Sequence, residues 1–295
     1  MPSGQFKHGA IGGQGWGIRT QVPCGHCTGC RQKKRDDWSI RCHHESKSYT
    51  NNSFITLTYD DAHLPADGSL HKPDLDRFIN TLRKHRERAD LPRFRYFGAG
   101  EYGKKNTLRP HYHLVLFGVW FDDAKKEQTK KENQVYTSET LHKLWGKGFC
   151  TIGNVEYATS AYVAKYCLER PSEYQAEKLN YYQRIRGSEI VTVAPEFNVA
   201  SRRPGLGLRW IEKNWKDVFP SDEVVILTST GYKRKQPPDY YLDWLKENHP
   251  AIWLEVKRNR KDKSDPDNPE NRENRLAARE LSKIKKANAK RKNAL

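Results

Sequence analysis

The sequence predicts an α+β fold whose central part is an antiparallel β-sheet. Strand-like segments alternate with amphipathic helical segments between residues 54 and 170. A Cys-rich stretch precedes them and a basic stretch follows. We therefore expect four regions, which are a Cys-rich basic N-terminal module (1–50), a central domain (51–170), an accessory region (171–256) and a basic flexible tail (257–295).

Four segments of the central domain have the β-branched and aromatic composition of strands. They are FITLTY (54–59), RFRYFGAGEY (93–102), HYHLVLFGVWF (111–121) and GFCTIGNVEY (148–157). No internal repeat connects them. Each segment is therefore expected to take a distinct place in one sheet.

Three further segments have the spacing or the end signals of helices. Residues 74–88 place apolar side chains at helical intervals, and residues 138–146 begin with a Ser cap and stop at Gly146. Residues 159–170 are stopped by Pro171. The resulting order β-α-β-β-α-β, followed by one more helix, matches a ferredoxin-like split βαβ sheet. We expect helices on one face of this sheet and an open opposite face.

The regions that flank the central domain carry weaker signals. Residues 31–47 form a basic helical stretch, and VVIL (224–227) resembles a strand. Residues 257–295 contain 14 Lys and Arg against 6 Asp and Glu, so this tail is expected to be disordered or a solvated helix until it meets nucleic acid.

The charge balance indicates the class of partner. The 295 residues carry a formal net charge of +17, and the default partner of so basic a chain is nucleic acid. Aromatic residues make up 11% of the chain, which suits stacking on single-stranded bases. No apolar run is long enough for a membrane span and no secretory signal is present, so we expect no membrane partner and a reducing cytoplasm.

The segment RPHYH (109–113) has the pattern of a metal site. Residues two apart in a strand share a face, so His111 and His113 can hold one divalent ion while Tyr112 points the other way. Glu101 ends the preceding strand, and hairpin pairing would bring it beside the histidines as a third ligand. Two imidazoles and one carboxylate suit Mn²⁺, and Mg²⁺ also fits when a substrate phosphate completes its shell. The alternative is a pair of ordinary surface or core histidines in a strand, because a lone His-x-His pattern often occurs without a metal.

The segment YVAKY (162–166) places two tyrosines one helical turn apart. Tyr162 and Tyr166 could act as paired nucleophiles, with Lys165 near the same helix face. A phenol has a pKa near 10, so its attack on phosphate needs a nearby cation. Tyr162 is the preferred first nucleophile because Lys165 lies three residues after it. The alternative is an aromatic stripe that packs on the sheet.

A cluster of cysteines lies near the N-terminus. Cys24, Cys27, Cys30 and Cys42 could form a tetrahedral zinc site, with His26 or His43 as substitutes. The alternative is a set of reduced cysteines that pack a small turn. Cys150 and Cys167 fall inside expected core elements and are interpreted as structural.

Taken together, these segments resemble the replication initiator proteins of gokushovirus-type microphages. The matching segments occur in the family's order across residues 22–227, and they are VPCGHCTGCR, FITLTYDDAHLP, GEYG, RPHYHLVLFG, SAYVAKYCLER, SRRPGLG and PSDEVVI. The resemblance extends to the wider HUH endonucleases, the two-tyrosine rolling-circle initiators among them.

This resemblance implies a function and residue roles. It implies a metal-dependent enzyme that nicks one DNA strand at the viral origin through a 5′-phosphotyrosine link, frees a 3′-hydroxyl primer and rejoins the displaced strand. His111 and His113 match the metal-binding motif, Tyr162 and Tyr166 match the catalytic tyrosines and Lys165 matches the accompanying lysine. Glu101 matches the acidic ligand by position only.

The expected partners are single-stranded and origin DNA. No Walker A motif is present, so unwinding would need a host helicase, and the freed 3′-hydroxyl would serve a DNA polymerase. Arg109, Arg202 and Arg203 are the expected DNA contacts. Two alternatives stay open, namely a non-catalytic, zinc-containing nucleic-acid-binding protein and a transposase or relaxase of the same chemistry.

Overall fold

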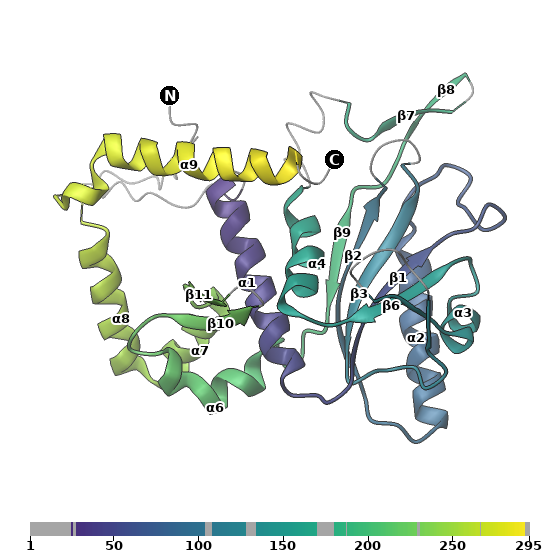
Figure 1. Cartoon of the computed structure of the whole chain (residues 1–295), viewed down its shortest axis with the longest axis horizontal. Helices are drawn as coiled ribbons and strands as arrows, with labels where there is room; N and C mark the ends of the chain where they lie inside the picture. The colour runs from purple at the N-terminus through teal and green to yellow at the C-terminus, as the bar shows by residue number, and fades with distance from the viewer. Residues whose placement is uncertain are drawn as a thin grey trace, which may run out of the picture.

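The computed structural model describes residues 25, 28–103, 108–127, 134–169, 180–186, 188–228, 231–265 and 267–292 (Figure 1). This part of the chain is a mixed α+β structure with eight α-helices, one seven-stranded antiparallel sheet and two two-stranded sheets. The large sheet has the order β4-β5-β6-β1-β3-β2-β9. Its strands are β1 (Asn52–Thr58), β2 (Arg95–Tyr102), β3 (Pro110–Phe117), β4 (Lys125–Lys126), β5 (Tyr136–Thr137), β6 (Cys150–Asn154) and β9 (Phe197–Ala200).

The elements predicted for the central domain are confirmed in kind and in order. The four predicted strands are β1, β2, β3 and β6, and they are neighbours in the order β6-β1-β3-β2. The three predicted helices are α2 (Lys72–Arg88), α3 (Glu139–Trp145) and α4 (Tyr157–Glu169). The ends differ from prediction by up to four residues.

The two ends of α3 show why the sequence predicted where this helix begins and ends. The Ser138 hydroxyl accepts a hydrogen bond from the Leu141 backbone N–H, which satisfies a donor that the first turn leaves open. Gly146 takes the left-handed conformation (φ 62°) and ends the helix.

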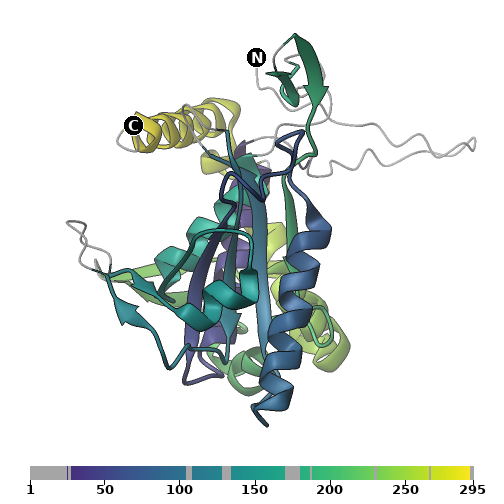
Figure 2. The same ribbon diagram turned by 90° about the vertical axis from the view of Figure 1, so that its right-hand side faces the viewer.

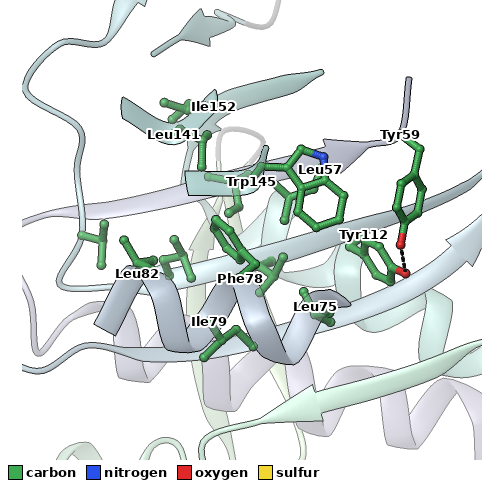
Figure 3. Packing of buried hydrophobic residues seen from close by; sticks show 14 of the residues in the cluster. Leu57, Tyr59, Leu75, Phe78, Ile79, Leu82, Tyr112, Leu141, Trp145 and Ile152 are labelled. Atoms are coloured by element: carbon green, nitrogen blue, oxygen red, sulfur yellow. Dashed lines mark hydrogen bonds between the residues drawn. The ribbon is translucent and has the colours of Figure 1, made fainter. Parts of the chain in front are cut away.

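One face of the sheet packs against α2 and α3. Buried apolar side chains of β1 and β3 pack against apolar side chains of the two helices, as Figure 3 shows for Leu57, Phe78 and Trp145. Tyr112 is fully buried here, and its hydroxyl lies 2.9 Å from the Tyr59 hydroxyl. The prediction that Tyr112 points away from the histidines is therefore confirmed.

The prediction of helices on one face only is wrong. The opposite face is covered by α1 (Thr28–Ser46) and α4, and these two helices lie against each other (Figures 1 and 2). Cys42 and Val163 of these helices pack with Phe97 and Val115 of the strands. The strands carry apolar residues on both faces, so a second layer is needed to keep them from water.

The predicted accessory region contributes to two parts of the structure. Its strand β9 joins the large sheet beside β2. A separate core gathers Ile40 of α1 with Ile211, Ile226 and Tyr241 from later elements. Those elements are α6 (Leu208–Val218), β10 (Val224–Thr228), β11 (Gly231–Lys235), α7 (Asp239–Asn248) and α8 (Pro250–Lys263). The strand predicted at 224–227 is thus confirmed, while the four-region division stays a prediction.

The remaining elements are a hairpin and the tail. The hairpin pairs β7 (Gln183–Arg186) with β8 (Glu189–Thr192). After α8, the short 3₁₀ helix Pro269–Asn271 leads into α9 (Glu273–Lys292), whose described side chains are exposed. Of the two states expected for the tail, this part of it takes the solvated helix. In the described ranges, no helix is long and apolar enough to cross a membrane.

Candidate metal centre

Three predicted ligands meet on the sheet face that α4 covers. Glu101 on β2 is the cross-strand partner of His111 on β3, and His113 follows two residues later on the same face. The Glu101 carboxylate oxygen Oε1 lies 2.8 Å from His111 Nε2 and 2.9 Å from His113 Nε2. The three ligand atoms lie within 4.8 Å of one another. Strand pairing therefore places two imidazoles and one carboxylate around one point, as the hairpin argument predicted.

This donor set fits a divalent metal ion. Imidazole nitrogen and carboxylate oxygen both ligate first-row divalent metals, and two histidines with one carboxylate leave coordination positions for substrate or water. The side chains of Glu101 and His113 are 8% and 7% exposed, so the ion would be held largely inside the protein. The identity of the metal does not follow from these contacts.

Each histidine is held by a second contact that orients its ring. His111 Nδ1 lies 3.1 Å from the Arg109 carbonyl oxygen, which accepts and therefore fixes the proton on Nδ1. His113 Nδ1 lies 2.9 Å from the Thr56 hydroxyl on β1. Both rings thus direct Nε2 toward Glu101, the arrangement by which outer contacts orient metal ligands. The sequence reasoning missed Thr56, although its position in FITLTY places it on the histidine face.

The electrostatics link the three groups. Burial acts to raise the pKa of Glu101, but the hydrogen bonds and charges of the two histidines outweigh burial and lower it. Burial acts to lower the pKa of His111, and the contacts with Glu101 outweigh burial and raise it. Burial dominates at His113 and lowers its pKa. Binding of a metal ion to His111 Nε2 therefore competes with protonation of that nitrogen.

Tyr162 of α4 lies beside these ligands. Its ring meets the His113 ring edge to face, with centroids 5.4 Å apart, and meets Phe54 at 6.1 Å. Phe54 in turn stacks on His113 at 5.5 Å. Tyr162 is 42% exposed, so it borders both the buried ligands and solvent. The side chains of Lys165 and Tyr166 lie outside the described residues, although both positions belong to α4.

The three predicted DNA-contacting arginines lie in two places. Arg109 is next to the metal ligands, where its Nε donates to the Tyr59 carbonyl oxygen and its Nη2 contacts Asp61 at 2.5 Å. The Asp61 side chain is 95% exposed. Arg202 and Arg203 are exposed in the loop between β9 and α6. That loop is joined to β2 by hydrogen bonds between Ser201 and Tyr96, which is five strand positions or about 17 Å from the candidate ligand Glu101.

The predicted four-cysteine zinc site is wrong for Cys42. Cys30 and Cys42 both belong to α1, and twelve residues of helix separate them by about 18 Å. Cys42 is also fully buried against the sheet. Cys24, Cys27 and the proposed substitute His26 lie outside the described residues. The predicted structural role of Cys150 agrees with its packing against the sheet core, and the Cys167 side chain is not described.

The family model and the three relatives that match this chain are all described as replication-associated proteins. A family model described as replication-associated protein ORF2/G2P matches residues 52–170. The replication-associated protein VP4 of Bdellovibrio phage phiMH2K is 36% identical over 241 residues, which is 79% of this chain and 70% of that protein. The replication-associated protein ORF2 of Spiroplasma virus 4 is 32% identical over 255 residues, which is 80% of this chain and 75% of that protein.

A shorter match has the same description. The replication-associated protein ORF4 of Chlamydia phage 1 is 30% identical over 151 residues, or 49% of this chain and 37% of that protein. No solved structure matches this chain.

Proposed function

Because the chain belongs to the microvirus replication-associated proteins of the gokushovirus type, we propose that it is a metal-dependent, site-specific single-strand DNA endonuclease and strand transferase. It would nick one strand of the viral origin, keep the 5′ end as a phosphotyrosine and free a 3′-hydroxyl primer. It would later rejoin the displaced strand into a circle. The observation that carries the proposal is the edge contact between Tyr162 and His113, which sets a nucleophile beside a candidate metal centre.

The architecture supports the same proposal. The neighbouring strands β6-β1-β3-β2 have the order expected of a split βαβ sheet, in which β3 lies between β1 and β2. We propose that this sheet is of the HUH type. The histidine pair then lies on a central strand and the tyrosines lie on the helix after β6, as the resemblance implies.

The metal centre would act on the scissile phosphate. Glu101, His111 and His113 would hold Mg²⁺ or Mn²⁺, which supplies a Lewis acid that polarises the phosphate and stabilises charge on its oxygens. Arg109 and Thr56 hold the two histidine rings in the orientation that this role needs. Arg109 could also hold a phosphate oxygen if its guanidinium exchanges the exposed Asp61 for DNA.

The chemical step exchanges one ester bond for another. The Tyr162 phenol oxygen gives up its proton and forms a bond to phosphorus, while the bond between phosphorus and the 3′-oxygen breaks. The 3′-oxygen takes a proton and leaves as a hydroxyl. Rejoining is the reverse displacement, in which a 3′-hydroxyl attacks the phosphotyrosine and the phenol leaves. No external energy source is needed, because each step conserves one phosphodiester.

The second tyrosine would allow repeated rounds. We propose that Tyr166 cleaves again while Tyr162 still carries DNA, and that Lys165 supplies positive charge near both. We also propose that the protein acts in the host bacterial cytoplasm with a host helicase and DNA polymerase. A structural zinc ion on Cys24, Cys27 and Cys30 is a further proposal.

Nicking of a single-stranded phage origin oligonucleotide tests the function. With Mn²⁺ or Mg²⁺ we expect a covalent protein–DNA adduct, and mass spectrometry of the adducted peptide should identify residue 162 or 166. The variant Tyr162→Phe/Tyr166→Phe should form no adduct. An adduct that persists in this variant refutes the nucleophile assignment. Binding without cleavage favours the non-catalytic zinc protein, and cleavage confined to transposon or plasmid-transfer sequences favours a transposase or relaxase.

A further inference from the structure

An arginine-rich cavity lies at the end of the sheet opposite the metal centre. Its volume is about 1060 Å³, and three parts of the chain line it, namely the end of α2 with the following loop, the start of β2 and the loop between β9 and α6. Seven arginines and two carboxylates line the cavity, which is a formal excess of five positive charges. We name it the arginine cavity.

Two of these arginines build the walls. Arg86 is buried and donates to the carbonyl oxygens of Pro92 at 3.0 Å and Gly118 at 2.9 Å, which fixes the loop after α2. Arg95 donates to the Pro204 carbonyl oxygen and lies 3.2 Å from Glu45, which ties the β9–α6 loop to α1. The cavity is therefore shaped by buried contacts rather than by surface side chains.

The remaining arginines carry the unbalanced charge. All five are exposed, and in the described part of the chain no carboxylate lies within 4.0 Å of their side-chain nitrogens. Like charges gathered in one place repel, and a bound polyanion removes that cost. The five are Arg83, Arg93, Arg202, Arg203 and Arg209.

The position of the cavity relative to the metal centre follows from one strand. Arg95 lines the cavity and Glu101 is a metal ligand, and both belong to β2. Six residues of strand separate them by about 20 Å. A DNA strand with one phosphate every 3.4 Å spans that gap in about six phosphates.

We propose that the arginine cavity is a second DNA site, which holds backbone phosphates of the origin about 20 Å from the phosphate that is cut. The proposal rests on the proposed function for the identity of the DNA. Guanidiniums bind phosphate oxygens in pairs, and Tyr49 and Tyr96 in the lining offer aromatic faces to bases. The exposed arginines come from three separated segments, which suits a polymer that crosses the cavity.

Binding measurements test the site independently of cleavage. The variant Arg93→Ala/Arg202→Ala/Arg203→Ala is compared with Lys125→Ala/Lys126→Ala/Lys143→Ala, which removes three exposed charges from β4 and α3 that do not line the cavity. Anisotropy of a labelled 30-nucleotide single strand at several salt concentrations gives affinity and salt slope. Three phosphate contacts on a single strand contribute a slope of about 2, so the cavity variant should lose about that much and bind about tenfold more weakly. The β4/α3 variant should change little.

Two further measurements separate the outcomes. A nick-site oligonucleotide with two nucleotides on either side is too short to span the gap of about 20 Å to the cavity. The cavity variant should therefore nick it at the wild-type rate. Replacement of the same arginines by lysine should keep most of the salt slope. The proposal would be overturned by equal losses in the cavity and β4/α3 variants, by an unchanged salt slope in the cavity variant, or by a mononucleotide that binds as tightly as long DNA. If wild type never nicks but the cavity variant alone loses binding, the second site stands and the proposed function fails.

Discussion

The Tyr162 ring meets the His113 ring edge to face, with 5.4 Å between the centroids. Tyr162 comes from α4 and His113 from β3, so this contact joins the helix to the candidate metal ligands. Phe54 completes the group by stacking on His113. Tyr162 therefore borders both solvent and the candidate metal centre, which is the position that the proposed attack on a phosphate requires.

The substitution Tyr162→Phe separates packing from chemistry. Phenylalanine keeps the ring that contacts His113 but lacks the oxygen, so the fold should persist while the first adduct forms about 10³-fold more slowly or more. Any residual adduct should map to Tyr166. The control is Tyr157→Phe in the same helix, where the ring packs on His43 and touches no metal ligand. Wild-type adduct formation by Tyr162→Phe would contradict the assignment.

The hydroxyl of Thr56 should tune metal affinity. It lies 2.9 Å from His113 Nδ1, and loss of such an outer contact typically weakens metal binding by about 10–100-fold. Thr56→Val should therefore weaken Mn²⁺ binding by that factor in calorimetric titration, with nicking restored at high Mn²⁺. Thr58→Val, two residues along β1, is the matched control because its hydroxyl makes no hydrogen bond to either histidine in the described structure. Equal effects of the two variants would argue against the orienting role.

The candidate metal centre was predictable because it depends on short-range rules. The period of a strand put His111 and His113 on one face, and hairpin pairing put Glu101 opposite His111. The same rule places Thr56 of β1 on the face of the histidines, but the sequence-based prediction did not include it. The roles of Lys165 and Tyr166 at this site stay predictions.

The second helical layer was not predictable from local patterns. α1 has few apolar residues that could signal its packing. Ile40 packs in a core with the later helices, whereas Cys42 packs in a different core with α4 and the sheet. β9 has four residues and pairs with β2 across about a hundred positions, which no local signal specifies. Such contacts depend on tertiary packing, which overrides local propensity.

The position of Cys42 predicts which cysteines matter for zinc. Cys42 is buried against the sheet about 18 Å along α1 from Cys30, so Cys42→Ala should leave zinc content unchanged. Cys27→Ser should lower the zinc content if the N-terminal cysteines bind zinc. Metal analysis of the purified, folded variants is the measurement. Loss of zinc from a folded Cys42→Ala protein would show that α1 does not hold the two cysteines apart.

Asp74 should give the stability of the protein a defined dependence on pH. This buried carboxylate accepts from the Tyr59 hydroxyl at 2.9 Å and pairs with Arg77 at 3.0 Å. Burial acts to raise its pKa, but the hydrogen bonds from Tyr59 and His71 and the charge of Lys147 lower it below the ordinary 3.8. The stabilisation is therefore complete above about pH 5 and is lost as the pH falls through the folded-state pKa.

Asp74→Asn keeps the shape of the side chain and removes the charge. Its free energy of unfolding at pH 7 should fall by about 1.5–3 kcal/mol, since a hydrogen bond to a charged group contributes that much. The difference from wild type should shrink below about pH 4, because protonation then removes the same charge from the wild-type protein. Urea unfolding at pH 7, 5 and 3.5 measures the trend. The control is Asp76→Asn, whose exposed carboxylate pairs only with Lys72 among the described residues and should change stability by less than about 0.5 kcal/mol. A difference at Asp74 that stays constant down to pH 3.5 would mean that its charge does not stabilise the fold.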